Sequence, residues 1–169
     1  MHTIGTLVVY RQNVCRIVDI LPNYRDGRDY YQLEGHFDTS LVIHTPMELA
    51  DACMRHIMSR DEAESVIDDL PTYEDIEPDG AVIREICAEH MERGNHRNIM
   101  RILRAHRLEK SGAVKPVYRW NEGDRQALRV AEEILYRELG AALGKSSKAI
   151  RSKIYDRLTA AVARQVAAV

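Results

Sequence analysis

Two Cys-x-x-His pairs are the residues of this chain whose types and spacing could bind a metal. They are Cys53 with His56 and Cys87 with His90. Residues three apart share one face of a helix, so each pair could supply two ligands to zinc. The second pair, however, falls where an expected helix needs Cys87 as a small apolar residue, and the first falls in an expected strand. We therefore predict no metal and no cofactor.

The segment from Gly140 to Ser146 is similar to a phosphate-binding loop. Such a loop has four residues between its glycines and a strand before the first one. Here three residues separate Gly140 from Gly144, and a helical pattern precedes them. These residues are therefore expected to end one helix and begin the next. Because nucleophile and metalloprotease motifs are also absent, we expect that the chain is not an enzyme and takes no small-molecule substrate.

The basic residues of the C-terminal half are better organised. Arg97, Arg101 and Arg104 are spaced four and three apart, which places them in one stripe of a helix, opposite its apolar residues. Within 95–120 the only acidic residue is Glu109. Such a run could neutralise several phosphates, so we predict a DNA-binding surface without strong sequence preference. Its other cations are Arg107, Lys110, Lys115, Arg119, Arg125 and Arg129.

Charge is distributed unevenly along the 169 residues, whose net charge is −2. Residues 1–80 carry 6 Lys+Arg and 16 Asp+Glu, a net −10, whereas residues 81–169 carry 18 and 10, a net +8. Such asymmetry indicates that one half binds a polyanion. The alternative, that helical surfaces are simply rich in arginine, stays open on composition alone.

Composition and cysteine usage indicate a soluble cytoplasmic protein. Hydrophobic residues make up 45% and charged residues 30% of the chain, the balance of a folded domain. Three cysteines are an odd and sparse set, so we expect a reducing compartment and no disulfide framework. No apolar run approaches the roughly 18 to 20 residues that cross a bilayer, and the N-terminus lacks the pattern of a secretory signal. We expect no membrane partner.

The first part of the chain has the pattern of strands. Short segments rich in β-branched and aromatic residues occupy 5–10, 15–20, 29–35 and 40–45, separated by turn-forming residues that include 22–27. No helical crossover fits between them, so the strands must be mostly antiparallel. With Met54–Met58 as the fifth strand, the sheet is expected to curl into a small barrel.

Helical patterns follow from Ser59 onward. Ser59–Glu62 is a capping box for a short helix that Pro71 stops, and the acidic segment after it is predicted to join two domains, 1–72 and 79–169. Four helices are then expected, at about 80–93, 96–110, 122–140 and 148–165. The fold class is therefore α+β: a five-stranded barrel followed by an all-α four-helix domain.

Trp120 is the only tryptophan and directly precedes the expected helix cap Asn121. A large apolar residue at this position often packs on the first turn of its helix as a staple. The alternative is a stacking or wedge contact with a base. We expect the staple and keep the wedge as the alternative.

Seven segments form a pattern that runs in order from about residue 4 to 160 and covers both halves of the chain. They are Gly5–Tyr10, Tyr30–Leu33, Ile43–Pro46, Met54–Glu62, Ile102–Arg104, Asn121–Arg125 and Leu135–Leu143. Together these segments resemble the CarD/CdnL family of bacterial RNA polymerase-binding transcription regulators. The similarity departs at Gly80, where many members carry a wedge tryptophan, and at Asn13-Val14, where His-Gly is usual.

The resemblance implies a Tudor-like barrel, also found in transcription-repair coupling factors, that binds the RNA polymerase β subunit by strand addition. The matching edge is Ser40–Thr45, with Arg25, Arg28, Val42 and His44 as polymerase-binding residues. The helical domain would contact promoter DNA upstream of the −10 element, mostly at phosphates and the minor groove, and modulate open-complex stability. The protein would then associate with the nucleoid through polymerase. The alternative is a free-standing nucleic-acid-binding module with no polymerase contact, which predicts a basic barrel or exposed stacking aromatics.

Overall fold

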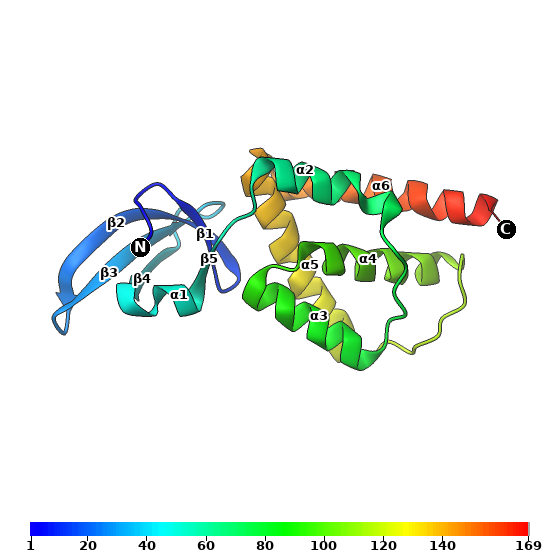
Figure 1. Ribbon diagram of the computed structural model, residues 1–169, viewed down its shortest axis with the longest axis horizontal. Coiled ribbons are helices and arrows are strands. Elements are labelled where there is room, and N and C mark those ends of the chain that lie inside the picture. Colours follow the sequence, from blue (N-terminus) through cyan, green and yellow to red (C-terminus); the bar gives the residue numbers. More distant parts are fainter. Residues whose placement is uncertain (169) are drawn as a thin grey trace. The chain divides into compact units, whose positions relative to one another are not determined.

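The computed structural model describes residues 1–168, which form a mixed α+β chain of two compact units. The first unit is Met1–Met58 and contains the sheet; the second begins at Ser59 and is helical (Figure 1). We call them the sheet unit and the helical unit. Each is described by itself.

The sheet unit contains five antiparallel strands in the order β4-β3-β2-β1-β5, so the predicted number of strands and their antiparallel direction are confirmed. The strands are β1 (Leu7–Tyr10), β2 (Asn13–Arg25), β3 (Arg28–Gly35), β4 (Val42–Pro46) and β5 (Met54–His56). The sheet is not closed, because β4 and β5 are its two edges in the described chain. The strand pairing therefore does not close the sheet into the expected barrel.

The long hairpin of β2 and β3 differs from the expected turn at 22–27. Strand β2 continues to Arg25, with a register shift after Leu21, and only two residues turn the chain. These are Asp26 and Gly27, with φ of 53° and 70°, the left-handed pair that a tight hairpin turn requires. The alternating pattern on β3 packs Tyr31 and Leu33 into the core. A 3-10 turn at Met47–Leu49 and helix α1 (Ala50–Cys53) precede β5 and were not predicted.

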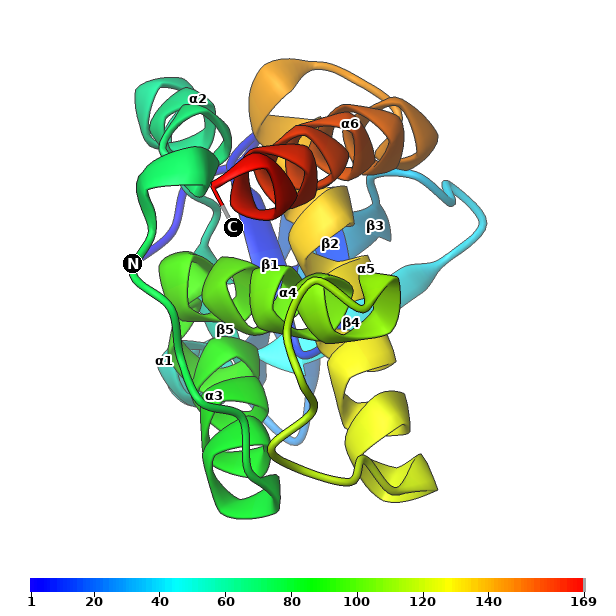
Figure 2. The ribbon, with the colours of Figure 1, turned by 90° about the vertical axis from the view of Figure 1, so that its right-hand side faces the viewer.

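The helical unit contains α2 (Arg60–Asp68), a 3-10 turn η2 at Leu70–Thr72, and four longer helices. In Figure 2, α4 lies between α3 and α6, while α5 crosses them. Polar caps begin the helices as predicted: side chains of Ser59, Asp79, Asn95, Asn121 and Ser146 accept from backbone N–H groups of the first turn. The longer helices are α3 (Gly80–Arg93), α4 (His96–Ser111), α5 (Glu122–Leu143) and α6 (Ser147–Ala167).

The segment that is similar to a phosphate-binding loop is a helix-to-helix connection. Helix α5 continues to Leu143, so the predicted end at Gly140 is wrong by three residues. Gly144 ends the helix with a φ of 66°, and the Ser146 side chain caps α6. The glycine and serine therefore serve as the stop and start of two helices.

The boundary between the units falls earlier than the predicted joint after residue 72. Helix α2 packs on α4 and α5, and η2 packs on α6; Ala63, Val66, Ile67 and Leu70 are buried there. The helical unit thus has five α-helices within the described residues, not four. The division also changes the charge balance. The sheet unit carries 5 Lys+Arg and 7 Asp+Glu, a net −2, and the remainder of the chain carries 19 of each.

Candidate nucleic-acid interface

The arginine stripe of α4 is hydrogen-bonded to the segment that precedes α3. The Arg97 guanidinium donates to the Asp69 carboxylate and to the Ser65 hydroxyl, each at 3.1 Å. Hydrogen bonds from Ser65 and Arg97 lower the pKa of Asp69. Arg101 donates from Nε to the backbone carbonyl of Glu74 at 3.1 Å. Both guanidinium groups thus hold residues 65–75 against α4.

Arg104 is largely buried, with a side chain only 12% exposed. It donates to the backbone carbonyl of Tyr73 and lies 2.8 Å from the Asp75 carboxylate. Arg104, which the spacing places on the outward side of α4 in a predicted DNA-binding stripe, is therefore largely covered by this segment, and Arg97 and Arg101 are hydrogen-bonded to it as well. The nine acidic residues of 61–79 belong to the same unit as the stripe, which explains why that unit has no net charge.

A second set of cations surrounds a hollow between α4, α5 and α6. The hollow has a volume of about 440 Å³ and an apolar floor that includes Leu103, Leu128 and Leu158. Its described lining holds five cations and one carboxylate, Glu132. We call this feature the cationic groove. Its cations are Arg107, Lys110, Arg125, Arg129 and Arg151.

Two tyrosines support arginines of the cationic groove. The Arg107 guanidinium lies over the Tyr155 ring, 4.4 Å from its centroid, and the Arg151 guanidinium lies 5.6 Å from the centroid of Tyr136. Such cation–π contacts orient a planar guanidinium without neutralising it. The Tyr136 hydroxyl donates to Glu132 at 2.5 Å, and burial raises the pKa of that tyrosine. Glu132, the one carboxylate of the described lining, is therefore hydrogen-bonded to a neutral side chain.

Arg125 and Arg129 approach the same carboxylate, Glu122, at 3.5 and 3.3 Å. All three side chains are at least half exposed. Surface ion pairs of this kind are worth about 0 to 1 kcal/mol. A phosphate could therefore replace Glu122 at little cost, which leaves both arginines available to an anionic ligand.

Trp120 is buried beside the cationic groove, with 7% of its surface exposed. Its Nε1 donates to the Glu109 carboxylate at 2.9 Å, and its ring centroid is 4.4 Å from that of His106. The indole thus packs on α4 and is not presented to a base. Burial and the nearby Lys110 lower the pKa of His106, so the ring on which the indole packs is neutral at neutral pH.

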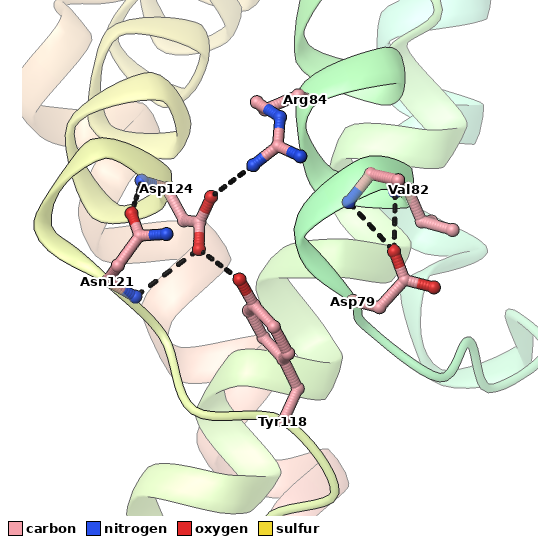
Figure 3. A network of polar contacts seen from close by, with 7 residues as sticks. Asp79, Val82, Arg84, Tyr118, Asn121 and Asp124 are labelled. Atoms are coloured by element: carbon pink, nitrogen blue, oxygen red, sulfur yellow. Dashed lines mark hydrogen bonds and ion pairs between the residues drawn. The ribbon is translucent and has the colours of Figure 1, made fainter.

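Asp124 fixes the loop that leads into α5 (Figure 3). Its carboxylate is 1% exposed, accepts from the Tyr118 hydroxyl at 2.7 Å and from the Asn121 backbone N–H at 3.3 Å, and lies 3.4 Å from Arg84. The Asn121 side chain accepts from the Asp124 N–H in return, which completes a capping box. The loop carrying Arg119 and the first turn carrying Arg125 are thereby held in place.

Gly80 leaves little room for a side chain at the start of α3. A Cβ at this position would lie 2.5 Å from the Tyr118 hydroxyl and 3.0 Å from Arg84. Gly80 itself is buried. Tyr118 therefore fills the space that a larger side chain at this position would need.

The structure brings together four of the predicted DNA-binding residues: Arg107, Lys110, Arg125 and Arg129. Arg119 lines an adjoining hollow that shares Lys110 and Arg125 with the groove. Lys115 instead lines a hollow beside the acidic residues Asp75 and Glu77. The arginine stripe of α4 (Arg97, Arg101 and Arg104) is instead hydrogen-bonded to the 65–75 segment.

Sequence reasoning missed Arg151 and Tyr155 of the cationic groove. Both lie on α6, four residues apart, and so share one face of that helix. That spacing was the available signal.

The predicted polymerase-binding residues lie on the edge strand and the long hairpin of the sheet unit. Val42 and His44 are on β4, and Val42 is 49% exposed. Arg25 and Arg28 flank the hairpin turn, and Arg28 lies 3.0 Å from Glu48. The sequence did not indicate that Tyr24 would join this surface; its ring centroid is 4.9 Å from that of His44.

Neither Cys-x-x-His pair belongs to a metal site in the described part of the chain, where no three metal-ligating side chains gather. Burial raises the pKa of the Cys15 and Cys87 thiols to about 11, so both are protonated at neutral pH. No helix within residues 1–168 combines the length and apolarity that crossing a membrane requires. Comparison with protein-family models and with curated proteins gives no match to this chain.

Proposed function

We propose that the chain is a transcription regulator of the CarD/CdnL type. Its sheet unit, as a Tudor-like module, binds the RNA polymerase β subunit, and its helical unit binds promoter DNA upstream of the −10 element. Binding both modulates the stability of the open complex. The protein works in the cytoplasm, at the nucleoid, without catalysis or a cofactor.

The cationic groove is the observation that carries the nucleic-acid part of this proposal. Five cations from three helices converge on one hollow whose described lining has a single carboxylate. A solvated helical surface would place acidic residues among them, as the Arg97 stripe has its own carboxylates. Phosphate contacts from such a set supply affinity that is independent of sequence and falls with salt.

The open edge strand β4 supports the proposal that the sheet unit binds RNA polymerase. An edge strand offers backbone N–H and C=O groups to a strand from another protein. Side chains around β4 add specific contacts, since Val42 and His44 are exposed and Arg25 lies at the end of the adjacent hairpin. Docking on polymerase would also raise the effective concentration of the helical unit near DNA, so that weak phosphate contacts suffice.

The free-standing nucleic-acid module stays the second candidate because of exposed aromatics on the sheet unit. Tyr24 is half exposed, with its ring centroid 5.4 Å from that of Tyr30 and 4.9 Å from that of His44. Such rings could stack on bases. The charge of the sheet unit, a net −2, is also less opposed to a polyanion than the −10 of residues 1–80.

The deciding experiment is calorimetry of the full chain with the cognate polymerase β lobe. We expect saturable one-to-one binding that Val42→Asp weakens at least tenfold, because a carboxylate there disturbs the pairing edge. The matched control is Val117→Asp, at an exposed valine of the helical unit, which should bind as the unaltered chain does. Absence of binding by a chain that still holds nucleic acid would instead favour the free-standing module.

A further inference from the structure

The cationic groove combines two kinds of surface that duplex DNA does not use together. Its rim is cationic, whereas its floor includes Leu103, Leu128 and Leu158. A duplex presents phosphates outward and keeps its bases stacked inside, so a concave apolar floor would stay unfilled beneath it. A single strand offers phosphates and exposed base faces at once.

Tyr155 provides a stacking position at the side of this groove. Half of its surface is exposed, although the Arg107 guanidinium already lies over its ring at 4.4 Å and bonds its hydroxyl. The two planar groups therefore form a stack that a base could extend. Aromatic platforms beside a cationic track are how proteins hold single strands without reading their sequence.

The size of the groove agrees with this ligand. A volume of about 440 Å³ lies within the roughly 300 to 1,000 Å³ typical of sites for small organic groups. It can enclose a base with its sugar while the flanking phosphates lie on the rim. Arg125 and Arg129 on α5 and Arg151 on α6 line the same hollow, so phosphates on both sides of that nucleotide would meet cations.

We propose that the cationic groove binds single-stranded nucleic acid, with phosphates on its arginines and a base stacked at Tyr155. This inference deepens the proposed function, on which it rests for the nucleic-acid ligand, by naming the strand state that the groove selects. At a promoter, a protein with this preference would favour the melted form of the DNA that it touches.

The test compares a fluorescent oligothymidine of about 15 nucleotides with a duplex of equal length, by anisotropy on the full chain at two salt concentrations. We expect the single strand to bind more tightly than the duplex. Tyr155→Ala should weaken single-strand binding about tenfold or more and duplex binding less than twofold. Tyr155→Phe should bind normally, because stacking needs the ring. The matched control, Phe37→Ala, removes an exposed aromatic of the sheet unit and should change neither.

A charge variant tests the rim independently. Arg129→Gln should reduce the slope of log affinity against log salt by about 0.7 on the single strand, the value expected for one lost phosphate contact. The control is Arg60→Gln, at another exposed arginine paired with a glutamate, and should leave the slope unchanged. Each variant is first checked for native circular dichroism.

Equal affinity for strand and duplex, or single-strand binding that survives Tyr155→Ala, would overturn the proposal. The comparison of single strand with duplex uses the unaltered chain, so it tests the proposal even if Tyr155→Ala does not fold. Duplex preference would leave the polymerase and promoter roles standing. Absence of polymerase binding would instead contradict the proposed function and would leave the single-strand preference of the groove unaffected.

Discussion

The Arg104 guanidinium lies 2.8 Å from the Asp75 carboxylate and also bonds the carbonyl of Tyr73, two residues earlier in the chain. An arginine whose spacing is typical of a DNA-binding stripe is thus a clamp on the segment between α2 and α3. Its side chain is largely withdrawn from solvent, which strengthens a charged hydrogen bond and makes its loss costly.

Replacing this clamp should destabilise the helical unit. We expect Arg104→Gln to lower the free energy of unfolding by about 1.5 to 3 kcal/mol, the range for hydrogen bonds to charged groups. Urea denaturation of the full chain, followed by Trp120 fluorescence, measures this. The control Arg60→Gln removes an exposed pair with Glu64 at 3.3 Å and should cost less than 1 kcal/mol. Equal effects of the two variants would mean that Arg104 is not a clamp.

Removing α2 should expose the core of the helical unit. Val66, Ile67 and Leu70 are at most 1% exposed, and α2 packs on α4 and α5. We expect a fragment of residues 59–169 to unfold cooperatively and a fragment of residues 73–169 to lose cooperativity or aggregate. Calorimetry of the two fragments makes the comparison. A sharp transition of similar enthalpy in both would place the boundary after residue 72 instead.

Acidification should loosen the contact between His106 and Trp120. Burial and Lys110 lower the folded-state pKa of His106 below its usual 6.5. Below pH 6.5 His106 therefore binds a proton more readily in the unfolded chain than in the folded one. The free energy of unfolding falls as the pH drops from 6.5 toward the folded-state pKa. Glu109, which faces the same ring, opposes the shift, whereas Arg125 adds to it. Above pH 6.5 this contribution is fully present.

The measurement is the urea midpoint between pH 7.5 and 5, followed by the emission of Trp120. His106→Gln, which does not titrate, should reduce the slope of stability against pH within this window. Both proteins should show the same slope above pH 7. A variant that keeps the full acid dependence below pH 6.5 would assign that dependence to other groups.

Local structure could be predicted from the sequence where neighbouring residues determine it. Turn residues and alternation located the five strands, and polar caps such as Asp79 and Asn121 located the helix starts within a residue. The hairpin was one exception, because the register shift after Leu21 lets β2 continue through Pro22 and Asn23. A bulge of this kind depends on the partner strand and not on the local composition.

The candidate site required the tertiary structure for two reasons. Helical periodicity shows which side of α4 carries arginines, but not that Asp69 and Asp75 return to cover that side. Nor does any local pattern show that Arg107 of α4 and Tyr155 of α6, 48 residues apart, are in contact. The boundary between the units could not be predicted for the same reason, since α2 is part of the helical unit only because it packs on α4 and α5.

The contact between Gly80 and Tyr118 yields a prediction that separates steric from polar effects. Alanine usually favours a helix over glycine by about 1 kcal/mol. Here its Cβ would lie 2.5 Å from a hydroxyl that the buried Asp124 holds at 2.7 Å. We therefore expect Gly80→Ala to destabilise the protein by about 1 to 3 kcal/mol, as overpacking does.

Tyr118→Phe removes the nearest clashing atom and the hydrogen bond to Asp124 together. Alone it should destabilise, because a buried carboxylate loses a donor. In its presence Gly80→Ala should cost less than in the unaltered chain, so the two substitutions should be coupled by roughly 0.5 to 3 kcal/mol in a double-mutant cycle. Urea denaturation of the four proteins measures this coupling. Strictly additive effects would show that the hydroxyl can move aside, and that the start of α3 has room for a side chain after all.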